Sequence, residues 1–229
     1  MLEIIFQDEN IIAINKPPGL LVHPSPIARN ADEFAMQMLR DQIGQHVYPA
    51  HRLDRKTSGV LLFGLNKESH KLLQQIFAEK LMQKVYYAIV RGYIGKSGVI
   101  DYALRNESGK LQDAVTQYER IATAELQVPF GRHSTSRYSL VKLMPETGRM
   151  HQLRKHMAHI RHPIIGDRPH GCNKQNKLFK EKWDLEEMML HAHQLSFNHP
   201  YTKENLDLRA SFPSEFIRIA SVMNFSLDV

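Results

Sequence analysis

Residues 51–59 read HRLDRKTSG and form the most informative stretch of the chain. A single carboxylate, that of Asp54, stands between the guanidinium groups of Arg52 and Arg55. The Thr-Ser-Gly end can form a tight, hydrogen-bonded turn, and the apolar run at 60–63 predicts a strand after it. A neighbouring arginine keeps a carboxylate ionised, which suits a nucleophile or a base and not a general acid. From these residue types alone, an ion pair in a surface loop is the more common explanation.

Working outward from this stretch, apolar runs and periodicity predict more strands than helices. We expect strands at residues 2–6, 11–15, 60–63, 84–92, 115–124, 137–144 and 190–197. We expect helices at 32–43, at 66–80 with Asn66 as the cap, after Thr147-Gly148 until about Pro163, and at 213–223. Residues 168–183 are polar and basic without clear periodicity. Because many strands follow one another without a helix between them, the sequence predicts an α+β fold with a large, mostly antiparallel sheet in one domain, residues 1–229.

The net charge fits a polyanionic partner, and it fits equally well the mild positive excess that many soluble proteins carry. The chain has 229 residues and a formal net charge of +6, with a pI of about 9.4, so its surface attracts nucleic acid or an anionic membrane. One cysteine, Cys172, excludes an internal disulfide framework and a zinc site built from several cysteines. The N-terminus has no signal-peptide pattern, and no apolar run is long enough to cross a membrane. We therefore expect a cytoplasmic protein that does not bind a membrane.

The stretch at 51–59 resembles the signature of the RluA family of pseudouridine synthases, His-Arg-Leu-Asp-Arg-x-Thr-Ser-Gly. Further family blocks are matched in order by INKPPG with VHP (residues 14–19 and 22–24), KVYYAIVRG (84–92) and TGRMHQLR (147–154). The resemblance covers residues 2–212. It implies the pseudouridine synthase catalytic fold with a central active-site cleft, and it favours a catalytic role for Asp54 over a surface ion pair.

The resemblance implies roles for four residues and no cofactor or metal. Asp54 matches the catalytic aspartate, which acts on a uridine that has been flipped out of the RNA. Tyr86 matches a tyrosine whose ring can stack on the flipped uracil, although a tyrosine in a strand is more often part of a core. Arg154 matches the basic residue that pairs with the catalytic aspartate. Arg52 matches an arginine that helps to fill the gap left by the base, with a phosphate contact or a pair with Asp54 as alternatives.

Affinity for RNA must come largely from contacts with phosphates. The candidate cations are Lys16, Arg149, Lys155, Arg161, Arg168, Lys174, Lys177, Lys180 and Lys182. The last five lie in the basic stretch at 168–183, for which a solvated loop is an equally good explanation. One family block departs from its pattern, because GDRPHG at 166–171 has His170 where relatives carry tyrosine. This puts a stacking role at position 170 in doubt and leaves the aspartate chemistry intact.

The substrate is narrowed by a further resemblance. The first predicted strand begins at Leu2, so we expect no N-terminal RNA-binding domain of the kind that many relatives carry. Among members without that domain, residues 1–4, 40–47 and 156–167 are most similar to those that modify uridine 65 in the T-arm stem of tRNA. The resemblance therefore implies tRNA as the partner, and we expect a monomer without an obligate protein partner.

Several other functions remain open at this level. The same reaction on ribosomal RNA or at another tRNA site is one, and a non-catalytic RNA-binding protein is another. A metal-dependent hydrolase is suggested by His151, His156, His159 and His162, but on a helix the first two point about 140° apart and no His-Glu-x-x-His pattern is present. A glycosidase needs a second carboxylate as its acid, and no obvious partner for Asp54 occurs.

Overall fold

The computed structural model describes residues 1–23 and 33–227. Contacts divide the chain into two compact units. Unit 1 comprises residues 1–84 and 192–211, and unit 2 comprises residues 85–191 and 212–229. No helix in the described part of the chain has the length and apolar character needed to cross a membrane.

Unit 1 is built on strands that pair mostly antiparallel and are covered by a helix. Its elements are β1 (Glu3–Gln7), β2 (Ile11–Lys16), α1 (Ala35–Ile43), β3 (Tyr48–Pro49), β4 (Ser58–Gly64), α2 (Lys67–Ala78), most of β11 (Leu190–Asn198), and β12 (Asn205–Arg209). The strands run in the order β1-β2-β4-β11, with β3 paired to β4 and β12 paired to β11. Leu73 of α2 packs with Val60 and Leu62 of β4 and with Leu195 and Phe197 of β11. This core fixes β4, the strand that follows the HRLDRKTSG stretch.

Unit 2 contains the second group of antiparallel strands and three helices. Its elements are most of β5 (Gln83–Arg91), β6 (Ser97–Asp101), β7 (Leu104–Arg105), β8 (Leu111–Gln112), β9 (Val115–Leu126), β10 (Ser136–Pro145), α3 (Gln152–His159), α4 (Asn173–Trp183) and α5 (Ser214–Val222). The main strands run in the order β5-β10-β9-β6, and β7 pairs with β8. The pairs β5–β10, β9–β10 and β6–β9 are all antiparallel.

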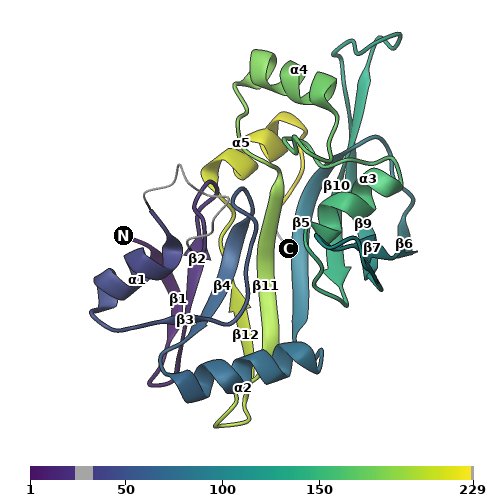
Figure 1. Ribbon diagram of the computed structural model, residues 1–229. Coiled ribbons are helices and arrows are strands. Elements are labelled where there is room, and N and C mark those ends of the chain that lie inside the picture. The colour runs from purple at the N-terminus through teal and green to yellow at the C-terminus, as the bar shows by residue number, and fades with distance from the viewer. Residues whose placement is uncertain (24–32, 228–229) are drawn as a thin grey trace. The chain divides into compact units, whose positions relative to one another are not determined.

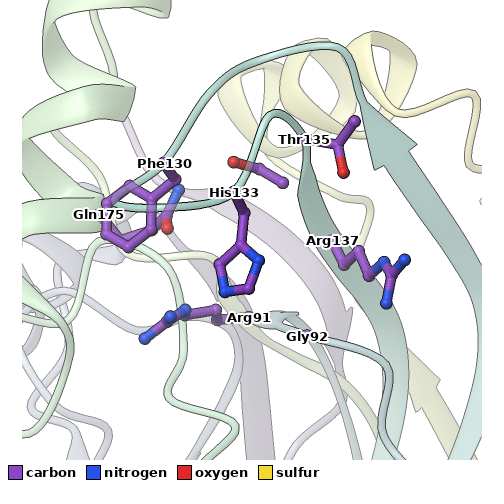
Figure 2. Close-up of a pocket in the computed structure, with 8 residues that line it drawn as sticks. Arg91, Gly92, Phe130, His133, Thr135, Arg137 and Gln175 are labelled. Carbon is purple, nitrogen blue, oxygen red and sulfur yellow. The ribbon is translucent and has the colours of Figure 1, made fainter.

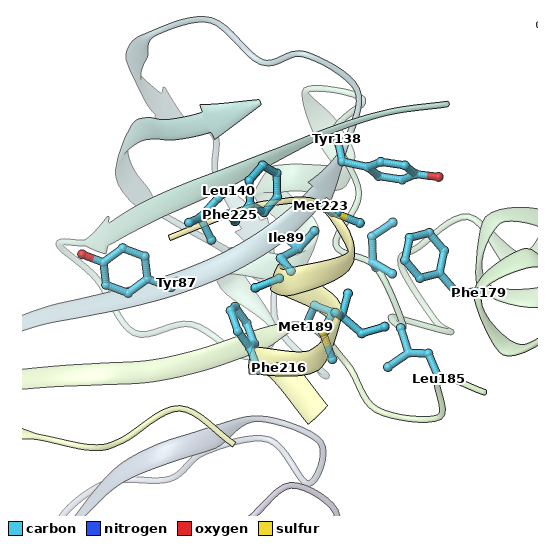
Figure 3. Packing of buried hydrophobic residues seen from close by; sticks show 13 residues of the cluster. Tyr87, Ile89, Tyr138, Leu140, Phe179, Leu185, Met189, Phe216, Met223 and Phe225 are labelled. Carbon is cyan, nitrogen blue, oxygen red and sulfur yellow. The ribbon is translucent and has the colours of Figure 1, made fainter. Parts of the chain in front are cut away.

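Side chains alternate across β5 and so build two cores, one on each face of unit 2. Ile89 packs with Tyr138, with Phe179 of α4 and with Phe216 of α5, as Figure 3 shows. On the other face, residues of β5 such as Ala88 pack with α3, which lies over β9 and β10 in Figure 1. Unit 2 therefore has helices on both faces of its strands.

The predicted α+β class and the mostly antiparallel pairing of the strands are confirmed. Each predicted strand is present within two residues of its expected ends. Asn66 caps α2 by accepting a hydrogen bond from the Ser69 amide at 2.8 Å, as predicted. The first helix begins at Ala35, and its expected start at Asp32 lies outside the described residues, as does Pro24 of the VHP motif. The short strands β3, β6, β7, β8 and β12 were not predicted.

The basic stretch at 168–183 is the largest difference from the sequence-based expectation. Residues 173–183 form the helix α4, in which Gln175 and Phe179 are buried one turn apart. Phe179 belongs to the core of unit 2. The helix has few apolar residues because only a narrow stripe of its surface faces this core, and its periodicity is therefore weak.

Candidate active site

Asp54 begins a tight turn that leads into β4. Its carbonyl oxygen accepts a hydrogen bond from the Thr57 amide at 3.0 Å, which places Arg55 and Lys56 at the exposed corner. Leu53 and Thr57 are buried on the two sides of the turn, whereas Asp54 is partly exposed. The predicted turn is confirmed, and its buried ends hold a carboxylate that keeps partial access to solvent.

Lys16 ties this turn to the loop that follows β2. Its ammonium group donates hydrogen bonds to the carbonyls of Pro17 (2.8 Å), Leu20 (2.9 Å) and Arg55 (3.2 Å). Burial lowers the pKa of Lys16 to about 7, and the negative charge of Asp54 acts in the opposite direction. The expectation that Lys16 contacts phosphate is wrong, because its side chain is 0% exposed and its donors face carbonyl groups.

A second pair of bonds joins the same two loops. The Gly19 amide donates to the Arg55 carbonyl at 2.8 Å, and the Arg55 Nε donates to the Gly19 carbonyl at 2.9 Å. The INKPPG block and the aspartate block are therefore neighbours in space within unit 1, and each fixes the backbone of the other.

Gly59 allows β4 to start close to β11. Its φ is +113°, and a Cβ at this position would overlap the carbonyl group of Ala192, whose carbon would lie only 2.6 Å away. Only glycine fits so near another backbone in this conformation. The last residue of the HRLDRKTSG stretch thus sets how closely the strand after Asp54 packs.

Two polar residues precede Asp54, namely His51 and Arg52, and their surroundings differ. The Arg52 side chain is exposed and forms no ion pair or hydrogen bond with any residue that the structure describes, so it is not paired with Asp54. His51 accepts a hydrogen bond from the Leu62 amide at 3.2 Å through Nε2. Desolvation, helped by the charge of Lys84, lowers the pKa of His51 to about 4, so this imidazole is neutral and supports β4.

Tyr86 lies on β5 of unit 2 and is partly buried. It packs against the cluster that contains Leu153 and Met157 of α3. Arg154 belongs to the same helix. The structure therefore brings Tyr86 to the face of unit 2 that α3 covers.

Arg154 forms a two-point ion pair with Asp167. Its Nε donates to Oδ2 at 2.9 Å and its Nη2 donates to Oδ1 at 2.7 Å. The side chains of Arg154 and Asp167 are 8% and 1% exposed. Sequence reasoning matched Asp167 to a family block but assigned it no role. The expected pair of Arg154 with Asp54 joins residues of different units and stays a prediction.

Gln152 holds the start of α3 in place. Its Oε1 accepts hydrogen bonds from the Thr147 hydroxyl (2.7 Å) and the Arg149 amide (3.0 Å). Its Nε2 donates to the Val115 carbonyl and the Thr116 hydroxyl, both at 3.0 Å. Each end of this buried amide thus has two partners, which uses its full hydrogen-bonding capacity. The TGRMHQLR block therefore fixes the helix that carries the candidate arginine.

Two of the four histidines between 151 and 162 meet Tyr102. His156 contacts the Thr116 hydroxyl and the Tyr102 carbonyl, both at 3.0 Å. His159 stacks on the Tyr102 ring. These two imidazoles therefore have structural partners within unit 2.

The other two histidines of this group lie elsewhere. His162 contacts the Arg91 carbonyl at 2.8 Å through Nδ1. The Nδ1 of His151 lies 2.9 Å from the Nε2 of His170. Among the described residues, no three histidine, cysteine or carboxylate side chains gather as metal ligands.

The candidate phosphate contacts on α4 and nearby loops fall into two groups. Lys177 and Lys180 pair with Glu181 (3.6 Å) and Glu186 (2.7 Å), which reduces their free charge. Exposed cations without such a carboxylate partner among the described residues are Arg161, Arg168, Lys174 and Lys182.

The last two candidates lie near the start of α3. Arg149 and Lys155 are partly buried, and both donate to backbone carbonyls, at 3.0 Å to Asp113 and at 3.5 Å to Arg105. Their contact with phosphate stays a prediction.

Comparisons with known proteins agree on one family. Residues 10–159 match the family model described as RNA pseudouridylate synthase. A tRNA pseudouridine synthase C of Vibrio parahaemolyticus is 50% identical over 221 residues, covering 92% of this chain and 90% of the relative. The protein of the same name from Yersinia pestis is 48% identical over 237 residues, covering 99% and 92%.

Solved structures support the same grouping. Human RNA pseudouridylate synthase domain containing 1 superposes with a TM-score of 0.74 at 25% identity, covering 93% of this chain and 84% of that one. Human RNA pseudouridylate synthase domain containing 4 has a TM-score of 0.73 at 26% identity, covering 98% and 94%. With the matched motifs and the α+β fold, these likenesses show that the chain belongs to the RNA pseudouridylate synthase family of isomerases.

Proposed function

We propose that the chain converts a uridine of tRNA into pseudouridine without a cofactor. The observation that carries this proposal is the 50% identity, over most of the chain, to a protein named tRNA pseudouridine synthase C. The similarity of residues 1–4, 40–47 and 156–167 to the members described above favours the T-arm stem as the target. We also propose that both units serve one catalytic domain, and that the protein acts as a cytoplasmic monomer.

The reaction sets clear chemical requirements. The N-glycosidic bond must break, the base must turn, and a ring carbon must join the ribose. A stacked uridine cannot do this, so it must be flipped into the protein at a cost of a few kcal/mol. We assign the anionic group of the reaction to Asp54, and attack on the sugar, addition to the base and proton removal from the sugar all need that carboxylate.

Three further residues complete the proposal. Tyr86 stacks on the flipped uracil, and Arg154 keeps the catalytic carboxylate anionic and in position. Arg52 helps to fill the gap in the RNA, a role that suits an exposed side chain without a protein partner among the described residues. Support for these roles comes from the family motifs that the four residues match.

The test is the conversion of unmodified tRNA by wild-type protein and by Asp54→Asn. Wild type should produce pseudouridine in the T-arm, as read by mapping modified positions. Asp54→Asn should bind tRNA within about threefold of wild type but produce no pseudouridine, because it removes the charge and keeps the shape. Asp113→Asn, a change at an exposed aspartate, is the matched control and should retain full turnover.

Ribosomal RNA and tRNA should be incubated in parallel. Product found only in ribosomal RNA would overturn the tRNA assignment and keep the reaction. Product formation by Asp54→Asn would remove Asp54 from its role. Tight binding of tRNA by wild type without any product in either RNA would support a non-catalytic RNA-binding protein.

A further inference from the structure

A cavity of about 230 Å³ lies in unit 2, and the residues that line it do not include Asp54, Tyr86 or Arg154. It is formed by the end of β5, the hairpin between β9 and β10, and α4. The charged, aromatic and amide side chains of the lining are those of Arg91, Phe130, His133, Arg137 and Gln175. Figure 2 shows the imidazole of His133 between the side chains of Arg91 and Arg137. Three nitrogen-rich groups thus line one cavity.

The cavity has an excess of positive charge. No aspartate or glutamate lines it. The Arg91 guanidinium lies 5.1 Å from the centre of the Phe130 ring and 3.9 Å from the Cys172 sulfur, and it forms no ion pair with a carboxylate among the described residues. Burial raises the pKa of the nearby Tyr138 to about 12, so this phenol stays neutral and does not offset the charge of Arg91.

Arg137 is only partly neutralised. Its Nε lies 3.4 Å from Glu125, and the two side chains are 58% and 34% exposed. An exposed pair of this kind is weak. Glu125 also accepts hydrogen bonds from the hydroxyl groups of Thr135 and Tyr93. A phosphate group can therefore compete for the Arg137 guanidinium.

The backbone around the cavity is fixed before any ligand arrives. The Gly92 amide donates to the Arg137 carbonyl at 2.7 Å, and the Arg91 amide donates to the Pro163 carbonyl at 3.0 Å. Across the hairpin, the Phe130 amide donates to the His133 carbonyl at 2.9 Å, and the His133 amide donates to the Phe130 carbonyl at 3.1 Å. Binding a ligand therefore requires little ordering of the main chain, so the conformational entropy cost of binding is small.

We propose that this cavity, whose lining includes none of the proposed catalytic or uracil-binding residues, binds the phosphodiester backbone of the RNA substrate. The inference rests on the proposed function, since it takes RNA as the substrate. Planar guanidinium groups match the oxygens of a phosphate, and an imidazole between them adds a donor. A chain with a net charge of +6 and a basic cavity suits a polyanion. Sequence reasoning did not include Arg91, His133 or Arg137 among the phosphate contacts.

The test measures the affinity for unmodified tRNA as a function of salt. Arg91→Met keeps much of the length of the side chain and removes its charge. It should weaken binding about 5- to 10-fold at about 0.1 M salt and reduce the slope of log K against log salt by about 1. Arg137→Met should act in the same direction with a smaller effect, because Glu125 already offsets part of its charge.

Two controls separate charge from packing. Arg91→Lys keeps the charge and should retain the wild-type slope. Arg209→Met removes an exposed arginine of unit 1 that pairs with Asp207 at 2.9 Å, and it should change neither affinity nor slope. In Arg91→Met and Arg137→Met, the KM for tRNA should rise and kcat should stay unchanged. If Arg91→Met does not fold, as judged by its melting temperature, Arg137→Met carries the test.

The outcomes distinguish this proposal from the proposed function. If both methionine variants keep the wild-type slope and still form pseudouridine in tRNA, the cavity does not bind the RNA backbone and the proposed function stands. If the methionine variants reduce the slope but the wild-type protein makes no pseudouridine, the cavity binds RNA and the proposed function is wrong. If Arg91→Lys lowers the slope as much as Arg91→Met does, the effect does not come from charge, and this too would contradict RNA binding by the cavity. The same holds if inorganic phosphate binds tightly there while tRNA binding is unaffected in the variants.

Discussion

Asp167 holds the guanidinium group of Arg154 through a two-point ion pair. The pair is almost completely buried, and both carboxylate oxygens of Asp167 take part in it. Replacing this carboxylate with a neutral amide would weaken the ion pair and allow the guanidinium group to shift. The proposed role of Arg154 therefore depends on a carboxylate that acts through it as a positioning group.

We predict that Asp167→Asn lowers kcat by about 10- to 100-fold, because a small displacement of a positioning group has effects of this size. The Kd for tRNA should stay within about threefold of wild type, so the loss should fall on kcat. Single-turnover kinetics at saturating tRNA would measure it, with Asp113→Asn as the control. An unchanged kcat in a folded Asp167→Asn protein would contradict the prediction.

The burial of Lys16 predicts a pH dependence of stability. Its pKa is about 7 in the folded chain, against an ordinary value of 10.5 for lysine. Between these two values the unfolded chain binds more protons, so the contribution of Lys16 to the free energy of unfolding rises with pH. The rise is at most about 5 kcal/mol, since each pKa unit corresponds to about 1.4 kcal/mol.

Lys16→Met should remove this dependence. The variant should therefore lose more stability relative to wild type at about pH 9.5 than at about pH 6. Denaturant unfolding of both proteins at the two pH values measures the difference. A gap that is constant or that shrinks with rising pH would show that the lysine does not titrate in this window.

At the scale of elements, the approach of β4 to β11 depends on Gly59. An alanine there would place its Cβ 2.6 Å from the carbonyl carbon of Ala192, which has no side-chain freedom to move, at a φ of +113°. We predict that Gly59→Ala destabilises the protein by about 3 kcal/mol or more, from overlap and backbone strain together. Gly95→Ala meets only the Tyr118 hydroxyl at 3.5 Å and should change stability by less than about 1 kcal/mol. Equal melting temperatures for the two variants would contradict this account.

The elements also show what the sequence can and cannot predict. Strands such as β4 and β5 were predicted because their apolar runs are long and bounded by turn residues. The helix α4 was missed because polar and charged side chains cover most of its surface. The strands β6 (SGVID) and β12 (NLDLR) were missed because neither has more than two consecutive apolar residues. Among the site residues, the turn at Asp54 followed from residue types. The burial of Lys16 did not, since lysine is seldom fully buried.

At the scale of the whole molecule, unit 1 is not continuous in the sequence. Residues 1–84 supply β1 to β4 and both helices, but most of β11 and all of β12 come from residues 192–211. Leu195, Phe197 and Leu208 from that later segment are at most 4% exposed within the core of unit 1. Asp54 therefore lies in a unit whose core is completed far along the chain.

This arrangement predicts that residues 1–84 do not fold alone. Losing three large buried side chains removes about 5–9 kcal/mol of burial free energy, which is comparable to the total stability of an ordinary domain. Without β11, the exposed edge of β4 would also lack its backbone partner. Circular dichroism and limited proteolysis of the 1–84 fragment, compared with the full chain, would measure this. A protease-resistant fragment with a cooperative melting transition would show that the first 84 residues carry enough of the core to hold the Asp54 turn by themselves.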